Sequence, residues 1–255
     1  MLNRRSFLKQ AAGCSAFFAA APTIARGQSK TPGMKSRIQM RKQLRLIIIA
    51  ALVLITAPQL GITGMSKDKK KPKDNWIELF NGKDMAGWRQ AGKGNFTLED
   101  GALVTHGGMG MLWFEAQKFR DFTLQVEWKV NHRCNNSGIF LRFPDKSDDP
   151  WNAVNNGYEI QIDDCDKKGL KYQTGAIYDH HPASKLASKP AGEWNLYEIT
   201  IVGQHYTVTL NGEKVTEFDG ERGREGYIGL QNHDIISRVS FRRVRVKEIQ
   251  VKETK

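Results

Sequence analysis

Alternation of apolar and polar residues is the main pattern in residues 75–255. In the run 122–130, every second residue from Phe122 to Val130 is apolar, and the residues between them are polar. A period of two residues predicts a β-strand with one buried face. Further runs with this period lie at 138–143, 158–163, 194–202, 206–210, 214–218, 227–231 and 239–246.

The segments between these runs also favour β structure. Asn211-Gly212 separates two of the runs, and this dipeptide is a strong β-hairpin signal. No window of ten residues in 75–255 carries a helical apolar stripe with capping residues. Many short strands separated by Gly, Asn and Asp predict an all-β sandwich or barrel, which we expect to form a single domain.

Charge is distributed unevenly along the chain. The formal net charge is +12, but residues 1–64 hold ten Lys and Arg and no Asp or Glu. The remaining residues carry 29 basic and 27 acidic side chains, a net charge of +2. The predicted domain therefore lacks the basic surface that nucleic-acid binding requires, and we expect no nucleic-acid partner.

The basic N-terminal part resembles a bacterial export leader. Segment 1–28 begins with Arg4-Arg5-Ser6-Phe7-Leu8-Lys9 and an Ala-rich stretch, which resembles a twin-arginine signal. A second hydrophobic segment, 40–64, contains twelve mostly apolar residues at 46–57, fewer than the roughly 20 that span a bilayer. Translation could begin at Met34 or Met40, or residues 46–57 could stay as an N-terminal anchor.

The predicted organisation is an export leader at 1–64, a Lys-rich linker at 65–75 and a β-sandwich domain at 76–249. We expect a periplasmic or secreted protein that meets a membrane only through an uncleaved leader. The domain contains Cys134 and Cys165. An oxidising compartment permits a disulfide between them, and two separate buried thiols are the alternative.

One strand carries three polar residues on a single face. In the run 158–163, Glu159, Gln161 and Asp163 alternate with apolar residues, so we expect these three to project from the sheet into solvent. Glu159 and Asp163 are four residues apart, about 13 Å along a strand, which exceeds the spacing of carboxyl pairs in ordinary glycosidases.

Other strands add polar groups to this face. Arg142 also leaves the apolar face of its run, and Gln231 and His233 lie at the end of another. Together they predict a polar patch of carboxylates, a guanidinium, an amide and an imidazole. The alternative is the ordinary solvated face of an antiparallel sheet. Trp151, in a Pro- and Asp-rich loop, is the best candidate for an aromatic platform under a sugar.

Motifs for other chemistry are absent from the sequence. It has no Gly-x-Ser-x-Gly elbow, phosphate loop or dinucleotide fingerprint. We predict no cofactor and no catalytic metal. The acidic turn 163–166 could hold a structural Ca²⁺, and a plain turn is the alternative.

Nine short motifs resemble, in order, those of the 3-keto-disaccharide hydrolase domain family, also described as 3-keto-glucoside lyase/hydratase. They are LFNGKD with GW (79–84, 87–88), DFTL (121–124), NSGI with LR (136–139, 141–142), YEIQID (158–163), TGAIY (174–178), KPAGEWN (189–195), LNG (210–212), GLQ with H (229–231, 233) and V with FR (239, 241–242). Three departures are Phe114 where Thr is common, Asp234 where Gly is usual, and Arg243 in place of Asn.

The resemblance implies a concanavalin A-like jelly roll, bacterial export and action on glycosides oxidised at sugar carbon 3. The 3-ketone acidifies the hydrogen on carbon 2, so the glycosidic bond can break by elimination, followed by addition of water. On this basis Glu159 or His233 is the expected base or acid, and Arg142 is the expected enolate stabiliser.

Gln161, Asp163, Gln231, Asn136, Tyr178 and Trp151 are the expected substrate-binding residues. The substrate would be a small glycoside. A non-catalytic carbohydrate-binding module is the alternative, because jelly rolls serve both uses.

Overall fold

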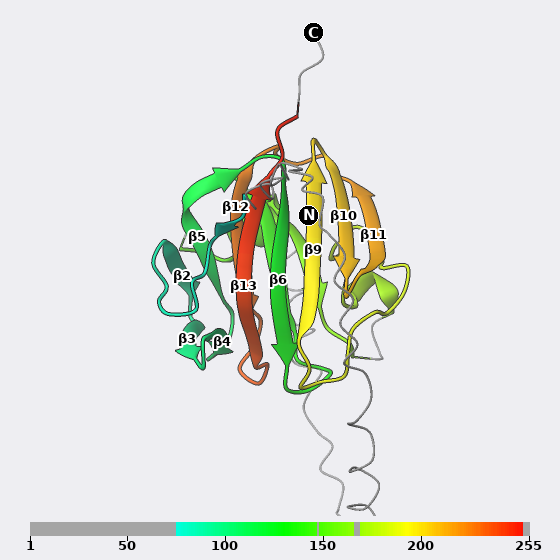
Figure 1. The fold of residues 1–255 in the computed structure, drawn as a ribbon. Helices are drawn as coiled ribbons and strands as arrows, with labels where there is room; N and C mark the ends of the chain where they lie inside the picture. Colours follow the sequence, from blue (N-terminus) through cyan, green and yellow to red (C-terminus); the bar gives the residue numbers. More distant parts are fainter. Residues whose placement is uncertain (1–74, 147, 166–168, 252–255) are drawn as a thin grey trace, which may run out of the picture. The chain divides into compact units, whose positions relative to one another are not determined.

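A computed structural model describes residues 75–146, 148–165 and 169–251. The predicted leader, residues 65–74 of the predicted linker and the apolar segment 46–57 lie outside these residues. Within them, two antiparallel sheets pack face to face (Figure 1). The strands are β1 Ile77–Glu78, β2 Trp88–Gly92, β3 Asn95–Glu99, β4 Ala102–His106, β5 Gly110–Phe119, β6 Phe122–Val130, β7 Ser137–Phe143, β8 Tyr158–Ile162, β9 Asn195–Val202, β10 His205–Leu210, β11 Glu213–Asp219, β12 Gly226–Asn232 and β13 Val239–Glu248.

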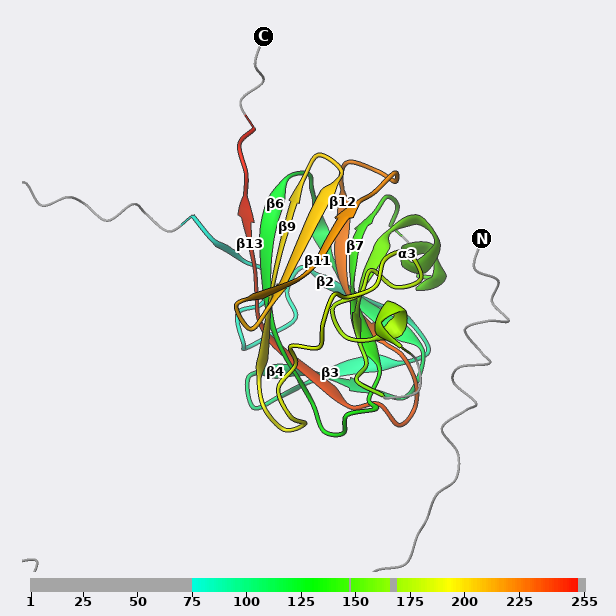
Figure 2. The ribbon, with the colours of Figure 1, turned by 90° about the vertical axis from the view of Figure 1, so that its right-hand side faces the viewer.

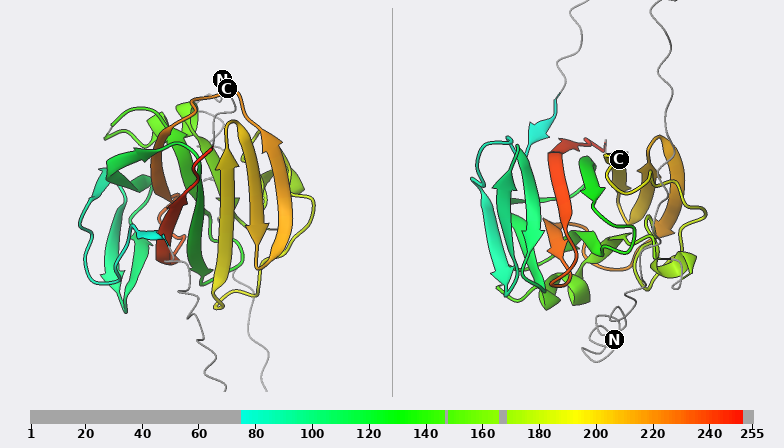
Figure 3. Two further views of the ribbon diagram at one scale, coloured as in Figure 1. Left: turned by 45° about the horizontal axis from the view of Figure 1, so that its top comes forward. Right: turned by 90° about the horizontal axis from the view of Figure 1, so that it is seen from below.

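The larger sheet has eight strands in the order β11-β10-β9-β6-β13-β4-β3, with β1 paired to β13. The smaller has five strands in the order β2-β5-β12-β7-β8. Strands from both ends of the described region therefore interleave. Figure 3 shows the red β13 among strands from much earlier in the sequence.

The alternation predicted the later strands well. All eight runs are strands, and the run 122–130 coincides with β6, whose residues alternate between buried and half-buried. Asn211 and Gly212 both have positive φ, at 53° and 86°, in the hairpin that joins β10 to β11. The sequence reasoning did not identify β1 to β5. Strands β1 to β4 have at most five residues each, and β5 has no sustained alternation of buried and exposed residues.

The core lies between the two sheets. Trp128 is fully buried there, as expected from its place on the apolar face of β6. A second, smaller apolar cluster lies on the opposite, outer face of the five-stranded sheet and includes Met111, Trp113 and Phe140.

Helix α3 (Trp151–Asn156) covers that outer face through Ala153 and packs against β7 and β8 (Figure 2). A 3₁₀ turn, η3, spans Leu170–Tyr172. Across the described ranges, no helix has the length and apolar character needed to cross a membrane.

The segment after η3 protects the free edge of β8. The N–H groups of Gly175 and Tyr178 donate to the carbonyl oxygens of Gln161 and Glu159, at 3.0 and 2.9 Å. The pairing satisfies backbone groups that an edge strand would otherwise expose. It also places Tyr178 beside Glu159.

Cys134 and Cys165 form a disulfide, with Cα atoms 4.5 Å apart, which decides between the two alternatives left open by the sequence. It joins the segment before β7 to the segment after β8. Asp163 Oδ1 accepts a hydrogen bond from the Cys165 N–H at 3.0 Å, so the cross-link lies next to one of the predicted site residues.

Removal of this disulfide should lower the free energy of unfolding. The bond spans 31 residues, and a loop of this size corresponds to about 3–4 kcal/mol in the chain-entropy account. We expect a loss of this order in a double variant, Cys134→Ser with Cys165→Ser, measured by urea unfolding. The wild type denatured without reductant should show the same number of free thiols as this variant, and two additional thiols would contradict the pairing.

Candidate functional site

Three neighbouring strands of the smaller sheet bring polar side chains together on its outer face. The register pairs Gly138 of β7 with Gln161 of β8, and Phe140 with Glu159. In β12, Leu230 pairs with Ile139, so the next residue, Gln231, lies beside Gly138. One row across the sheet therefore contains Gln231, Gly138 and Gln161.

The Glu159 side chain extends along the sheet over this row. A Cβ atom added at Gly138 would lie only 2.3 Å from Glu159 Oε1, so a glycine is needed at this position. With its amide nitrogen facing the carboxyl group, Gln161 donates to Glu159 Oε1 at 3.0 Å and to the Ser137 carbonyl at 3.3 Å. The carboxyl group thus lies between two amide side chains.

The Glu159 carboxyl group is almost completely buried, with the residue 6% exposed. Burial raises the pKa of Glu159 to about 8, and the approach of the Gln231 amide opposes this shift only in part. Oε2 of Glu159 and both polar atoms of the Gln231 amide have no hydrogen bond of normal geometry to the described residues. At neutral pH the group is therefore mostly a protonated acid.

The expectation of a solvated face on β8 is wrong. Tyr158, Ile160 and Ile162 belong to the core as predicted, and Glu159 and Gln161 lie on the other face. All five residues of β8 are nevertheless buried, because this sheet has apolar side chains and covering segments on both faces.

A second polar row lies at the end of the same strands. Asn136 Nδ2 donates to Asp163 Oδ2 at 3.2 Å, and His233 follows directly after Asn232, the last residue of the neighbouring strand β12. All three residues of this row are buried. It lies about 7 Å from the Gln161 row at ~3.3 Å per residue, close to the width of a sugar ring.

Asp234 and Ser237, whose part in the site the sequence reasoning missed, link Asn136 and His233 of the second row by hydrogen bonds. Asp234 Oδ2 lies 2.8 Å from His233 Nδ1, and Ser237 Oγ accepts a hydrogen bond from the Asn136 N–H at 2.8 Å. An Asp followed three residues later by Ser is typical of a side-chain-stabilised turn, and this signal could have identified both.

The remaining predicted binding residues flank these rows. Tyr178 is 8% exposed, packs edge-on against Tyr172 and lies next to Glu159. Trp151 is half-buried and begins helix α3, so its expected position in a loop is wrong. Pro150 immediately before it is suited to a helix start, which explains the difference.

Arg142 does not belong to the site. It is the additional residue of a bulge in β7, between the Tyr227–Phe143 and Ile228–Leu141 pairs, and its φ is +56°. The bulge directs the side chain away from the polar face. It is fully buried, donates to the carbonyl oxygens of Arg120 and Gly203, and lies 3.2 Å from Asp121 Oδ1.

Arg142 therefore connects turns of the larger sheet to the smaller sheet. The structure does not support its predicted role as an enolate stabiliser, because the side chain points away from the polar face and its two terminal nitrogens donate to the backbone carbonyls of Arg120 and Gly203. Among the described residues, no group of three or more His, Cys, Asp or Glu side chains could hold a metal ion. The predicted calcium turn includes Asp166, which lies outside the described residues.

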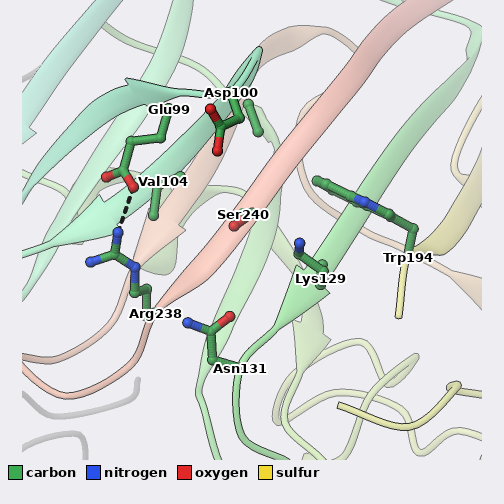
Figure 4. A pocket seen from close by; sticks show the side chains of 9 residues that line it. Glu99, Asp100, Val104, Lys129, Asn131, Trp194, Arg238 and Ser240 are labelled. Atoms are coloured by element: carbon green, nitrogen blue, oxygen red, sulfur yellow. Dashed lines mark hydrogen bonds and ion pairs between the residues drawn. The ribbon is translucent and has the colours of Figure 1, made fainter. Parts of the chain in front are cut away.

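A shallow groove lies on the outer face of the larger sheet (Figure 4). Two of its charged side chains, Arg238 and Glu99, form an ion pair with a 2.5 Å contact. The Arg242 guanidinium stacks 3.9 Å from the centre of the Trp194 ring. Because a cation already covers this ring, the groove is a poor sugar platform. Its described lining residues are Glu99, Asp100, Ala102, Val104, Lys129, Asn131, Trp194, Arg238 and Ser240.

Solved structures are similar to this sandwich. A Parabacteroides distasonis protein described as a glycosyl hydrolase is 27% identical with a TM-score of 0.59, over 68% of this chain and 99% of that one. A Bacillus subtilis protein with a galectin-like fold has a TM-score of 0.50 at 12% identity, over 68% of this chain and 94% of that one. The fold class is thus a concanavalin-like jelly-roll sandwich, as predicted.

Sequence comparison identifies the family. Residues 75–247 match the 3-keto-alpha-glucoside-1,2-lyase-like domain. The 3-keto-disaccharide hydrolase of Bacteroides thetaiotaomicron is 30% identical, over 68% of this chain and 78% of that relative. The chain belongs to the 3-keto-alpha-glucoside-1,2-lyase-like domain family, which confirms the resemblance found in its motifs.

The raised pKa of Glu159 predicts a specific pH dependence of stability. The folded protein keeps a proton that the unfolded chain releases between its ordinary pKa of 4.5 and about 8. This contribution is complete below about pH 4.5 and is lost as the pH rises toward 8. Relative to Glu159→Gln, which is neutral throughout, wild-type unfolding free energy should fall on the order of 3 kcal/mol between pH 5 and 8. The measurement is urea unfolding of both proteins at several pH values. The same change in unfolding free energy with pH in the two proteins would contradict the buried acid.

The assignment of Arg142 as a structural residue predicts a loss of stability on substitution. Arg142→Met preserves much of the side-chain volume but leaves the carbonyl oxygens of Arg120 and Gly203 without this donor. We expect the free energy of unfolding to fall by about 3 kcal/mol or more. Arg89→Met, which breaks an exposed ion pair with Asp148, should cost less than about 1 kcal/mol. A stable but inactive Arg142→Met protein would restore the catalytic assignment.

Proposed function

We propose that this chain is an exported enzyme that cleaves 3-keto-glycosides by elimination across carbons 1 and 2 and subsequent addition of water. The family and its curated relative support a substrate of this class. The observation that carries the proposal is a set of buried polar atoms on one sheet face, in Glu159, Gln231 and Asn136, without hydrogen-bond partners among the described residues.

Such atoms are costly to bury. Each unsatisfied polar group costs roughly 1–3 kcal/mol, so folded proteins seldom keep several together without a purpose. Sugar hydroxyl and carbonyl groups supply both donors and acceptors and would satisfy amides and a carboxylic acid. The second row, with Asn136, Asp163 and His233, lies at a distance that a sugar ring can bridge.

The protonation state of Glu159 favours an assignment of roles. A carboxylic acid kept neutral by burial can donate a hydrogen bond to an oxygen that gains charge, as the enolate oxygen does here. It could also protonate the departing glycosidic oxygen. His233 is then the base that removes the proton from carbon 2, and the amides of Gln161 and Gln231 orient the substrate. Arg142 has no part in this scheme.

Export is part of the same proposal. It rests on the twin-arginine-like and second hydrophobic segments and on the Cys134–Cys165 disulfide, a bond that persists mainly in oxidising compartments. A periplasmic or extracellular protein would meet oxidised glycosides from outside the cell. The alternative, a non-catalytic carbohydrate-binding module, would need no acid with a shifted pKa.

Substrate conversion by the purified full-length chain separates the two functions. We expect release of the aglycone from a 3-keto-glucoside and none from the unoxidised glucoside, because only the ketone acidifies carbon 2. Binding of both sugars without conversion of either would favour the module and contradict the enzyme.

Glu159→Gln should slow conversion of the 3-keto-glucoside by about 10²-fold or more, because the amide cannot transfer a proton. The substitution preserves the shape of the side chain. Glu193→Gln removes a charge from an exposed residue and is the matched control, with turnover within about twofold of the wild type. Full activity of Glu159→Gln would remove Glu159 from the mechanism.

A further inference from the structure

The turn after β12 contains a half-buried carboxylate, that of Asp234, which accepts four hydrogen bonds. Asp234 Oδ1 accepts the N–H groups of Ile236 and Ser237, at 2.9 and 2.6 Å. Asp234 Oδ2 lies 2.9 Å from Ser237 Oγ and 2.8 Å from His233 Nδ1. Burial raises the pKa of Asp234, but the hydrogen bonds of His233 and Ser237 outweigh this effect and lower it.

An ionised carboxylate only accepts hydrogen bonds, so this contact determines where the imidazole carries its proton. Nδ1 of His233 must be the donor, and in the neutral ring Nε2 is then the basic nitrogen. The same carboxylate accepts a hydrogen bond from the Ser237 hydroxyl group. Ser237 Oγ in turn accepts a hydrogen bond from the Asn136 N–H at 2.8 Å. The chain of bonds therefore extends from Asn136, in the candidate site, to His233.

We propose that Asp234 is a positioning residue that holds His233 as the Nδ1–H tautomer, so that Nε2 is the nitrogen that removes the substrate proton. The proposal rests on the proposed function for the reaction, and on the four contacts of Asp234 for the tautomer. Asp234 acts only through His233 and contacts no substrate.

Asp234→Asn tests this assignment, because the hydrogen bonds around residue 234 determine which His233 tautomer the variant must have. The two backbone N–H groups at the Oδ1 position require an oxygen, so the amide nitrogen must take the Oδ2 position. That nitrogen is a donor, and it faces His233 Nδ1. His233 must then accept at Nδ1 and carry its proton on Nε2, the opposite tautomer. The backbone bonds that shape the turn are retained, so we expect the variant to fold.

The tautomer is measured by long-range ¹H–¹⁵N NMR of the histidine side chains, with the His233 signals assigned from His233→Gln. We expect Nδ1–H in the wild type and Nε2–H in Asp234→Asn. On a 3-keto-glucoside, Asp234→Asn should lower kcat by about 10²-fold or more, with KM within about twofold, because the base is misplaced while binding remains.

Asp219→Asn is the matched control. Asp219 Oδ1 lies 2.8 Å from His205 Nδ1 in an exposed pair between β10 and β11, on the larger sheet. The same substitution there should leave kcat within about twofold of the wild type. A loss equal to that of Asp234→Asn would show that any such pair affects turnover and would overturn the positioning role.

Two other results would also overturn the proposal. One is an Nε2–H tautomer of His233 in the wild type, and the other is an unchanged kcat in Asp234→Asn when Glu159→Gln is inactive. If the wild type converts no 3-keto-glucoside, the proposed function fails. The role of Asp234 in orienting His233 is then tested by NMR alone. Nδ1–H in the wild type and Nε2–H in Asp234→Asn would support it.

Discussion

Burial of the Glu159 carboxyl group is the constraint on which the site depends. A charged carboxylate at this depth would lose its hydration without gaining a cation, since the nearest groups are the amides of Gln161 and Gln231. The group therefore holds its proton to about pH 8. A neutral acid can act as a hydrogen-bond donor and a proton source at neutral pH, which an exposed glutamate cannot.

The architecture around Glu159 maintains this burial. Gly138 leaves space for the side chain over β7, and the 174–178 segment closes the edge of β8. Helix α3 packs against β7 and β8, and the apolar cluster around Trp113 lies on the same outer face. Both faces of the five-stranded sheet are thus packed, so the sheet can hold a polar site in a largely dry environment, where electrostatic interactions are strong.

The period-two pattern predicted the fold and the sheet face on which the site residues lie. It did not predict that this face is buried. It placed Glu159 and Gln161 on the face opposite Ile160, because side chains alternate in any regular strand. It could not predict that a helix and a distant loop bury this face, because burial depends on contacts between segments far apart in sequence. The strands of the 88–119 region lack a clear alternation, partly because β5 is buried on both faces over its first four residues.

The error at Arg142 has a different origin. Alternation assumes a regular strand, but the bulge at this residue changes the direction of its side chain. The residue then binds backbone carbonyls at the other end of the core. Asp234 was noted only as a departure from the family pattern, and its role emerged from four contacts within one turn.

The central claim is that Glu159 is a neutral acid in the folded protein at pH 7. It is tested most directly by following the ¹³Cδ chemical shift of the Glu159 carboxyl group from pH 5 to pH 9, with the signal assigned from Glu159→Gln. The account predicts a titration midpoint near the pKa of about 8. A carboxyl group that is already ionised at pH 6, with a midpoint near 4.5, would contradict it.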